Sequence, residues 1–85
     1  MTQDQTEKLL VKLEEWKVAD RQIGDISDSV AVLSTTNPQS HSWGINFLIG
    51  DLVRVAEERQ DALRALKEFG IETHEDALAL TVKLF

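Results

Sequence analysis

The chain has no cysteine and no tyrosine among its 85 residues, and only one proline. Without cysteine it forms neither disulfides nor thiolate metal sites, which is compatible with the reducing interior of a cell. Two tryptophans and three phenylalanines give little aromatic surface on which nucleic-acid bases stack. These absences exclude a disulfide-stabilised scaffold and a cysteine-ligated zinc module, and they argue against a platform for single-stranded nucleic acid.

Basic residues and long apolar runs are also scarce. The formal net charge is −6, from 15 acidic and 9 basic residues, so DNA and anionic membranes repel the chain. No run approaches the ~18 apolar residues of a membrane span, and the start, MTQDQTEK, lacks the pattern of a signal peptide. We therefore expect a soluble, cytoplasmic protein with neither a membrane nor a nucleic-acid partner.

Apolar residues recur at steps of three or four through the first third of the chain. This spacing places them in a stripe along one face of an α-helix. The stripe keeps its phase across Gly24, although glycine costs about 1 kcal/mol in a helix interior. We therefore predict one helix over about 4–33 rather than two. Its stripe comprises Leu9, Leu13, Trp16, Ala19, Ile23, Ile26, Val30 and Leu33.

The least regular stretch, STTNPQSHSWG, follows this helix. Asn37 stands directly before Pro38, an order typical of a helix start, because asparagine caps free amides and proline needs no N–H there. We predict a turn over 34–37 and a second helix over about 38–69. Such a short connection makes the two helices antiparallel neighbours.

The same stretch offers serine and histidine side chains for catalysis. Ser40 and Ser42 flank His41, but adjacent helical side chains point about 100° apart, and no Gly-x-Ser-x-Gly elbow is present. His41 and His74 would be separated by the second helix, whose ~30 residues span roughly 45 Å, so they cannot share a metal. We expect no catalytic residue, no metal, no cofactor and no enzymatic activity.

The end of the second helix and the start of a third are marked by sequence signals. Gly70 supplies the left-handed residue that follows a helix, and Ile71 can fold back on Leu66. Thr73 has the side chain of an N-cap, which predicts a helix over about 74–84. Residues 77–85 also alternate as in a strand; we favour the helix because a lone strand has no pairing partner in this chain.

Two surfaces are candidates for interaction. Residues 22–53 contain no lysine or arginine but include Trp43 and Phe47, and aromatic residues without charge are typical of interface cores. The alternative is that they form ordinary intramolecular core. The polar face of the second helix is acidic, with Glu57, Glu58 and Asp61, and suits a partner protein with a basic surface.

Arg59 departs from its local pattern because it falls inside the apolar arc of the second helix. In an antiparallel hairpin it comes level with Trp16 and within reach of Glu15 or Asp20. It either stacks on Trp16 or pairs with an acid while its stem packs on the core. The alternative is that it fixes helix register or subunit pairing, or binds an anion.

The expected fold is all-α: one domain over 1–85, built as an antiparallel hairpin of two long helices plus a short C-terminal helix. The second helix is apolar over an arc of about 200°, more than one partner helix covers. We therefore expect a homodimer that forms a four-helix-type bundle. The predicted function is that of a non-enzymatic adaptor, inhibitor or regulatory subunit that binds another protein.

The alternative function is an oligomeric protein that binds or sequesters a small, nucleotide-like ligand in a pocket between subunits. The layout of a helix, a short polar connection and a second helix led by Trp43 is similar in outline to phage-encoded helical proteins that sequester cyclic nucleotides. The likeness is one of architecture without a shared motif, and it assigns a role to no residue.

Overall fold

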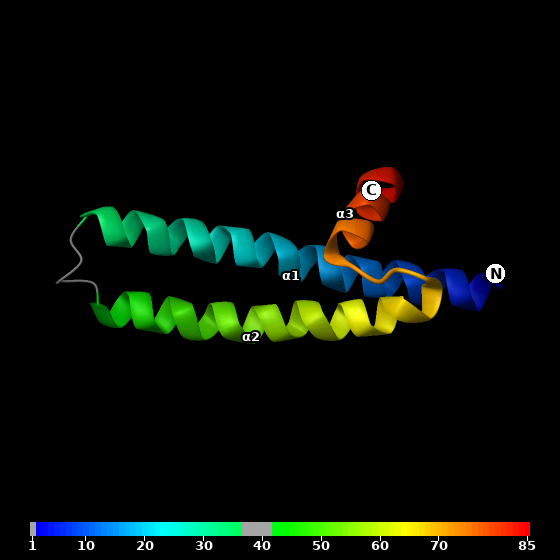
Figure 1. Ribbon diagram of the computed structural model, residues 1–85, viewed down its shortest axis with the longest axis horizontal. Helices are drawn as coiled ribbons and strands as arrows, with labels where there is room; N and C mark the ends of the chain where they lie inside the picture. Colours follow the sequence, from blue (N-terminus) through cyan, green and yellow to red (C-terminus); the bar gives the residue numbers. More distant parts are fainter. Residues whose placement is uncertain (1, 37–41) are drawn as a thin grey trace.

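The computed structural model describes residues 2–36 and 42–85, which form helices and contain no β-strand. The two long helices lie side by side and antiparallel, and the third packs near the end that holds the N-terminus (Figure 1). The molecule is elongated, 54 × 20 × 17 Å. The predicted all-α hairpin with a short C-terminal helix is confirmed. Its elements are α1 (Gln3–Thr36), α2 (Ser42–Leu66), the 3-10 turn η1 (Lys67–Phe69) and α3 (His74–Leu84).

Helix α1 is continuous through Gly24, so the stripe of apolar residues predicted one helix correctly. The turn predicted over 34–37 is wrong in its first three residues, which continue α1 to Thr36. Thr35 Oγ1 donates a hydrogen bond to the carbonyl oxygen of Val32 at 2.9 Å, so this hydroxyl is satisfied inside the helix. Asn37 and Pro38, the expected cap, lie outside the described residues.

The second helix was predicted to reach residue 69, but α-helical bonding ends at Leu66 and a 3-10 turn completes the element. Such tightening is frequent at helix ends. Gly70 follows with a φ of 82°, and its N–H donates to Lys67 O at 3.1 Å. The N–H of Ile71 donates to Leu66 O at 3.4 Å. This pair of bonds is a Schellman motif, and it returns the Ile71 side chain to the core.

Helix α3 follows after a short extended connection. Thr73 is its N-cap: the hydroxyl oxygen accepts a hydrogen bond from the N–H of Asp76 at 3.1 Å. Glu75 and Asp76 place negative charge in the first turn, where the helix dipole favours it. The alternating apolar pattern of residues 77–85 therefore belongs to a helix, as we favoured from the sequence, and not to a strand.

The buried core lies at one end of the hairpin. We call residues 3–20 of α1, 54–66 of α2 and everything after residue 66 the open end; residues 21–36 and 42–53 are the turn-proximal half. Trp16, Leu13, Leu66 and Val55, the largest fully buried side chains, all lie in the open end. The core cluster of the open end comprises Leu13, Trp16, Ala62, Leu63, Leu66, Ile71 and Ala77, with Leu9 and Leu80 packed against it.

Candidate functional site

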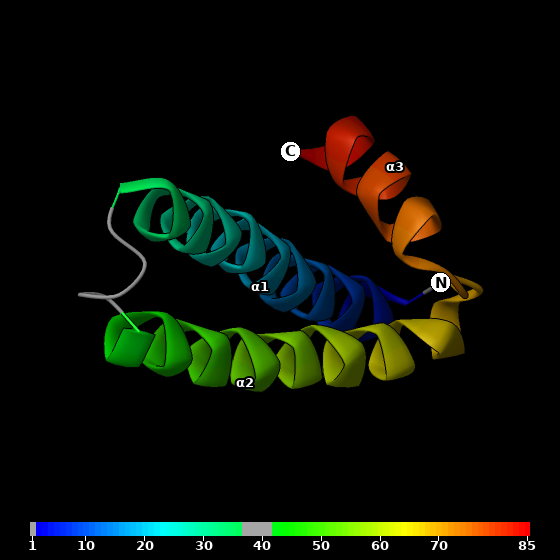
Figure 2. The ribbon, with the colours of Figure 1, turned by 60° about the vertical axis from the view of Figure 1, so that its left-hand side comes forward.

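The turn-proximal half contains no buried side chain among those described, at 21–35 and 44–53. Several of its large apolar side chains are instead exposed to solvent: Val32 by 60%, Phe47 by 64%, Ile49 by 45% and Val53 by 54%. Figure 2 shows α3 standing beside the part of α1 nearest the N-terminus, well away from the turn. The described residues of the segment without lysine or arginine therefore include no fully buried side chain, while several of its apolar side chains are half-buried: Ile23, Ile26, Val30, Leu33, Ile45, Leu48 and Leu52.

One row of α1 residues shows what α3 covers and what it leaves bare. Residues 13, 17, 20, 24, 27 and 31 follow one another at steps of four and three, and so lie along one flank of the helix. At the open end Leu13 shares the core cluster with Ala77, and Lys17 Nζ lies 4.7 Å from the centroid of the Phe85 ring. Beyond Asp20 the row continues with Gly24, Ser27 and Ala31, which are all exposed.

Helix α2 continues this bare flank across the hairpin. Ile49, Val53 and Ala56 lie at steps of four and three on the side of α2 that carries no charged residue in the turn-proximal half. Small side chains on α1 and apolar side chains on α2 thus form one face, which Asp28 flanks on α1. Trp43 belongs to α2, but its side chain lies outside the described part of the chain, so the structure gives it no place on this face.

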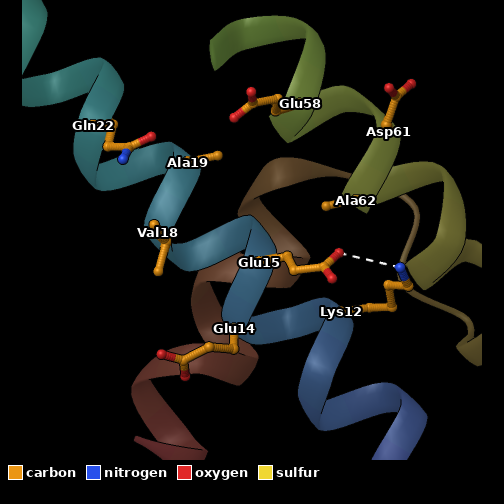
Figure 3. A pocket seen from close by; sticks show the side chains of 9 residues that line it. All are labelled: Lys12, Glu14, Glu15, Val18, Ala19, Gln22, Glu58, Asp61 and Ala62. Atoms are coloured by element: carbon orange, nitrogen blue, oxygen red, sulfur yellow. Dashed lines mark hydrogen bonds and ion pairs between the residues drawn. The ribbon is translucent and has the colours of Figure 1, made fainter.

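The acidic residues of α2 divide between two places. Glu58 and Asp61 line a groove of about 510 Å³ that runs between α1 and α2 (Figure 3). Glu57 is exposed and does not line the groove. Glu68, which follows α2 in η1, pairs with Lys8 at 2.9 Å. The acidic face that the sequence presented as uniform therefore has a concave part at Glu58 and Asp61, where α1 contributes the opposite wall.

The groove has an apolar floor and a charged rim. Ala19 and Ala62 point toward one another across it, and both are buried (Figure 3). Their methyl groups are too small to fill the space between the helices, which accounts for the hollow. Glu15 extends over the floor and pairs with Lys12 at 3.2 Å, while Glu58 and Asp61 stand on α2 (Figure 3). The other lining residues are Glu14, Val18 and Gln22.

Arg59 lies at the centre of the open end, where it links the two long helices. Its Nη1 donates to Asp20 Oδ1 at 2.6 Å, and both side chains are about one third exposed or less. Asp20 is one of the two acids that the sequence placed within reach, whereas the other, Glu15, pairs with Lys12. The Nε of Arg59 is buried without a hydrogen-bond partner.

A contact that sequence reasoning missed joins α1 to the first residue of α3. Trp16 Nε1 donates a hydrogen bond to His74 Nδ1 at 3.0 Å, and the two rings stack with centroids 6.1 Å apart. Burial and the nearby Arg59 cation lower the pKa of His74, while the Asp20 carboxylate opposes them. The sequence placed His74 correctly in α3, but no pattern within α3 indicates which α1 side chain it meets.

The described part of the chain has neither a group of side chains that could bind a metal ion nor a helix that could span a membrane. No cluster of three or more histidine, aspartate or glutamate side chains is placed to hold a metal ion at residues 2–36 or 42–85. Of the helices in these ranges, none is long and apolar enough to cross a membrane. Of the residues considered for catalysis, Ser40 and His41 lie outside the described residues, and Ser42 begins α2 with a side chain that is not described.

Comparison of the chain with known protein families, with curated proteins and with solved structures finds no match. The interpretation therefore depends on the surfaces themselves.

Proposed function

We propose that this chain is a non-enzymatic protein-interaction module, an adaptor, inhibitor or regulatory subunit, that works as a homodimer. The single observation that carries the proposal is the turn-proximal half, where none of the described side chains is buried. Leaving ~200 Å² of apolar surface in water forgoes roughly 5 kcal/mol at 25 cal/mol per Å². That is a large fraction of the stability of a domain this size, so the face favours a partner.

A second copy of the same chain fits this face. Residues 22–53 contain no lysine or arginine, and their acids are confined to Asp25, Asp28 and Asp51. Asp25 and Asp51 lie away from the row formed by Gly24, Ser27 and Ala31, whereas Asp28 flanks it, four residues after Gly24 and three before Ala31. Pairing the two hairpins through this row produces a four-helix bundle at the turn-proximal half, with one self-complementary interface.

The mass of the protein in solution tests the proposal. Light scattering at micromolar concentration is expected to give twice the chain mass of 9.6 kDa. Val53→Glu puts a charge on the proposed face and should give one chain mass with helicity retained. Val82→Glu is the matched control, because Val82 is 76% exposed on α3, away from that face. A wild-type mass of one chain would overturn the dimer, as would equal effects of the two variants.

The alternative function, a small nucleotide-like ligand held between subunits, receives less support. The groove between α1 and α2 is lined by four carboxylates against one ammonium, and this excess of negative charge repels phosphate. Residues 22–53 contain no lysine or arginine to attract it. Thermal stabilisation of the protein by a nucleotide, absent from the Val53→Glu variant, would favour this second function instead.

A further inference from the structure

We infer that the groove between α1 and α2 at the open end binds a cationic amphipathic helix of another protein. The inference rests on the proposed function as an interaction module, and it assigns that module a binding surface separate from its dimer face. The groove has a volume of about 510 Å³ and is walled by both long helices. Its occupant is identified by three features: the available length, the apolar floor and the charge of the rim.

The first feature is length. On α1 the groove extends from Lys12 to Gln22, about 15 Å of helix axis. The apolar stripe of α1 faces α2, and α3 covers the flank on one side of this stripe. Lys12, Glu15 and Ala19 lie on the flank on the other side, so the groove and α3 occupy opposite flanks of α1. Helix α3, which occupies the first flank, has 11 residues. The hairpin thus already seats one helix of this length, and the α1 wall of the groove offers a similar length, with α2 closing the other side over about 6 Å from Glu58 to Ala62.

The second feature is the floor. Ala19 and Ala62 are 3% and 5% exposed, and Val18 is 46% exposed at the outer edge of α1. A helix that lies in such a groove inserts aliphatic side chains at steps of three and four. The small floor residues leave room for these side chains, which a leucine or phenylalanine at position 19 or 62 would fill.

The third feature is charge. Glu14, Glu15, Glu58 and Asp61 line the groove against a single cation, Lys12. The partners of Glu58 and Asp61, Arg54 and Arg64, are not lining residues, and their ion pairs are exposed to solvent. Exposed pairs of this kind are worth little and exchange easily. Lysine or arginine side chains flanking the inserted apolar stripe therefore meet carboxylates on both walls, whereas a second copy of this acidic chain does not.

The test uses a synthetic helical peptide of eleven residues, the length of α3, with a leucine stripe flanked by lysines. Calorimetric titration of the full chain at about 0.15 M ionic strength measures its affinity. Glu58→Gln should weaken binding about fivefold, at the upper end of the effect of one exposed ion pair. Glu57→Gln, the same charge change one residue away and outside the groove, should change the affinity less than about twofold.

A second pair of variants tests position rather than charge loss. Val18→Lys puts a cation on the groove wall and should weaken peptide binding more than about tenfold. Val11→Lys makes the same change two helical turns earlier, at a side chain that is 56% exposed and does not line the groove. It should have little effect. Circular dichroism checks that both exposed substitutions leave the helices intact.

Each outcome decides the inference. Selective loss with Glu58→Gln and Val18→Lys supports the groove. If the two variants of each matched pair weaken binding equally, the peptide is attracted to the whole acidic chain, and the inference is overturned. The absence of peptide binding overturns it as well. The titration is repeated with the Val53→Glu variant, whose mass reports the dimer. The Val53→Glu monomer is expected to bind the peptide as the wild type does. A wild-type protein that has the mass of one chain and still binds the peptide overturns only the dimer face, and a wild-type dimer that fails to bind it overturns only the groove.

Discussion

The open end and the turn-proximal half share the same two helices but differ in what covers them. At the open end, α3 and the Schellman motif place Ile71 and Ala77 over the hairpin, and Trp16 becomes fully buried. Among the described residues, no third helix lies against the turn-proximal half, and no side chain there is buried. A pair of helices buries one stripe on each, so a third element decides whether the hairpin has a core.

The largest expected effect compares one leucine from each region of α2. Leu66 is fully buried, so Leu66→Ala should lower the free energy of unfolding by about 3 kcal/mol. Leu48 lies in the turn-proximal half and is half-buried, so Leu48→Ala should lower the free energy of unfolding by only about 1 kcal/mol. This cost is measured in a Val53→Glu background, where the second copy is absent. Urea unfolding measures both values. Equal costs would mean that the two halves are equally well packed in one chain.

The next effect concerns the contact that ties α3 to the open end. Trp16→Phe removes the donor to His74 Nδ1 and should lower the free energy of unfolding by about 2 kcal/mol. His74→Ala removes the acceptor, and a double-mutant cycle isolates their coupling. Without coupling between the two positions, the Trp16–His74 hydrogen bond would contribute nothing to holding α3.

The sequence predicted much of this fold and less of its surfaces. Stripe periodicity is a local property, so the helices and the continuity of α1 at Gly24 followed from it. The groove between Ala19 and Ala62 depends on which helix flanks face one another, which spacing along one helix does not determine. The partner of His74 depends on where α3 docks. The turn boundary was wrong because serine and threonine also fit helices when their hydroxyls bond to the backbone.

Two glycines test the regions at the level of the backbone. Gly70 has a φ of 82°, so Gly70→Ala forces a side chain into the left-handed region and should cost about 1 kcal/mol. Gly24 lies inside α1 with no atom within 4 Å of an added Cβ. Gly24→Ala should therefore stabilise the single chain by about 1 kcal/mol. Thermal unfolding in the Val53→Glu background compares the stability of the two variants. If both substitutions changed the stability in the same direction, the backbone geometry at Gly70 or at Gly24 would be contradicted.

The smallest effect is a pH dependence confined to the open end. The folded state lowers the pKa of His74 from its ordinary 6.5, because it favours the neutral ring. The resulting stability is present above pH 6.5 and is lost as the pH falls through the lower folded value. Urea unfolding at stepped pH should show this loss in the wild type. His74→Asn should flatten the slope, and an unchanged slope would assign it to other groups.

Arg59 supplies a check on the cause of that shift. Its cation contributes to the low pKa of His74, so Arg59→Leu should move the pKa back toward 6.5. Asp20→Asn removes the opposing carboxylate and should lower the pKa further. Proton NMR titration of the His74 ring reports both pKa values, and shifts in the same direction would show that at least one of the two charges does not act on His74 as the geometry implies.

The most direct test of the account is amide hydrogen exchange as a function of protein concentration. Backbone amides at 21–35 and 44–53 should gain protection as the concentration rises, because a second copy covers them. Backbone amides around Trp16 and Leu66 should gain only the protection that dimer formation gives to every amide by stabilising the folded chain. These amides should already be protected in the Val53→Glu variant. If both regions were equally protected in dilute protein, the turn-proximal half would be complete in one chain and the proposed dimer face would have no role.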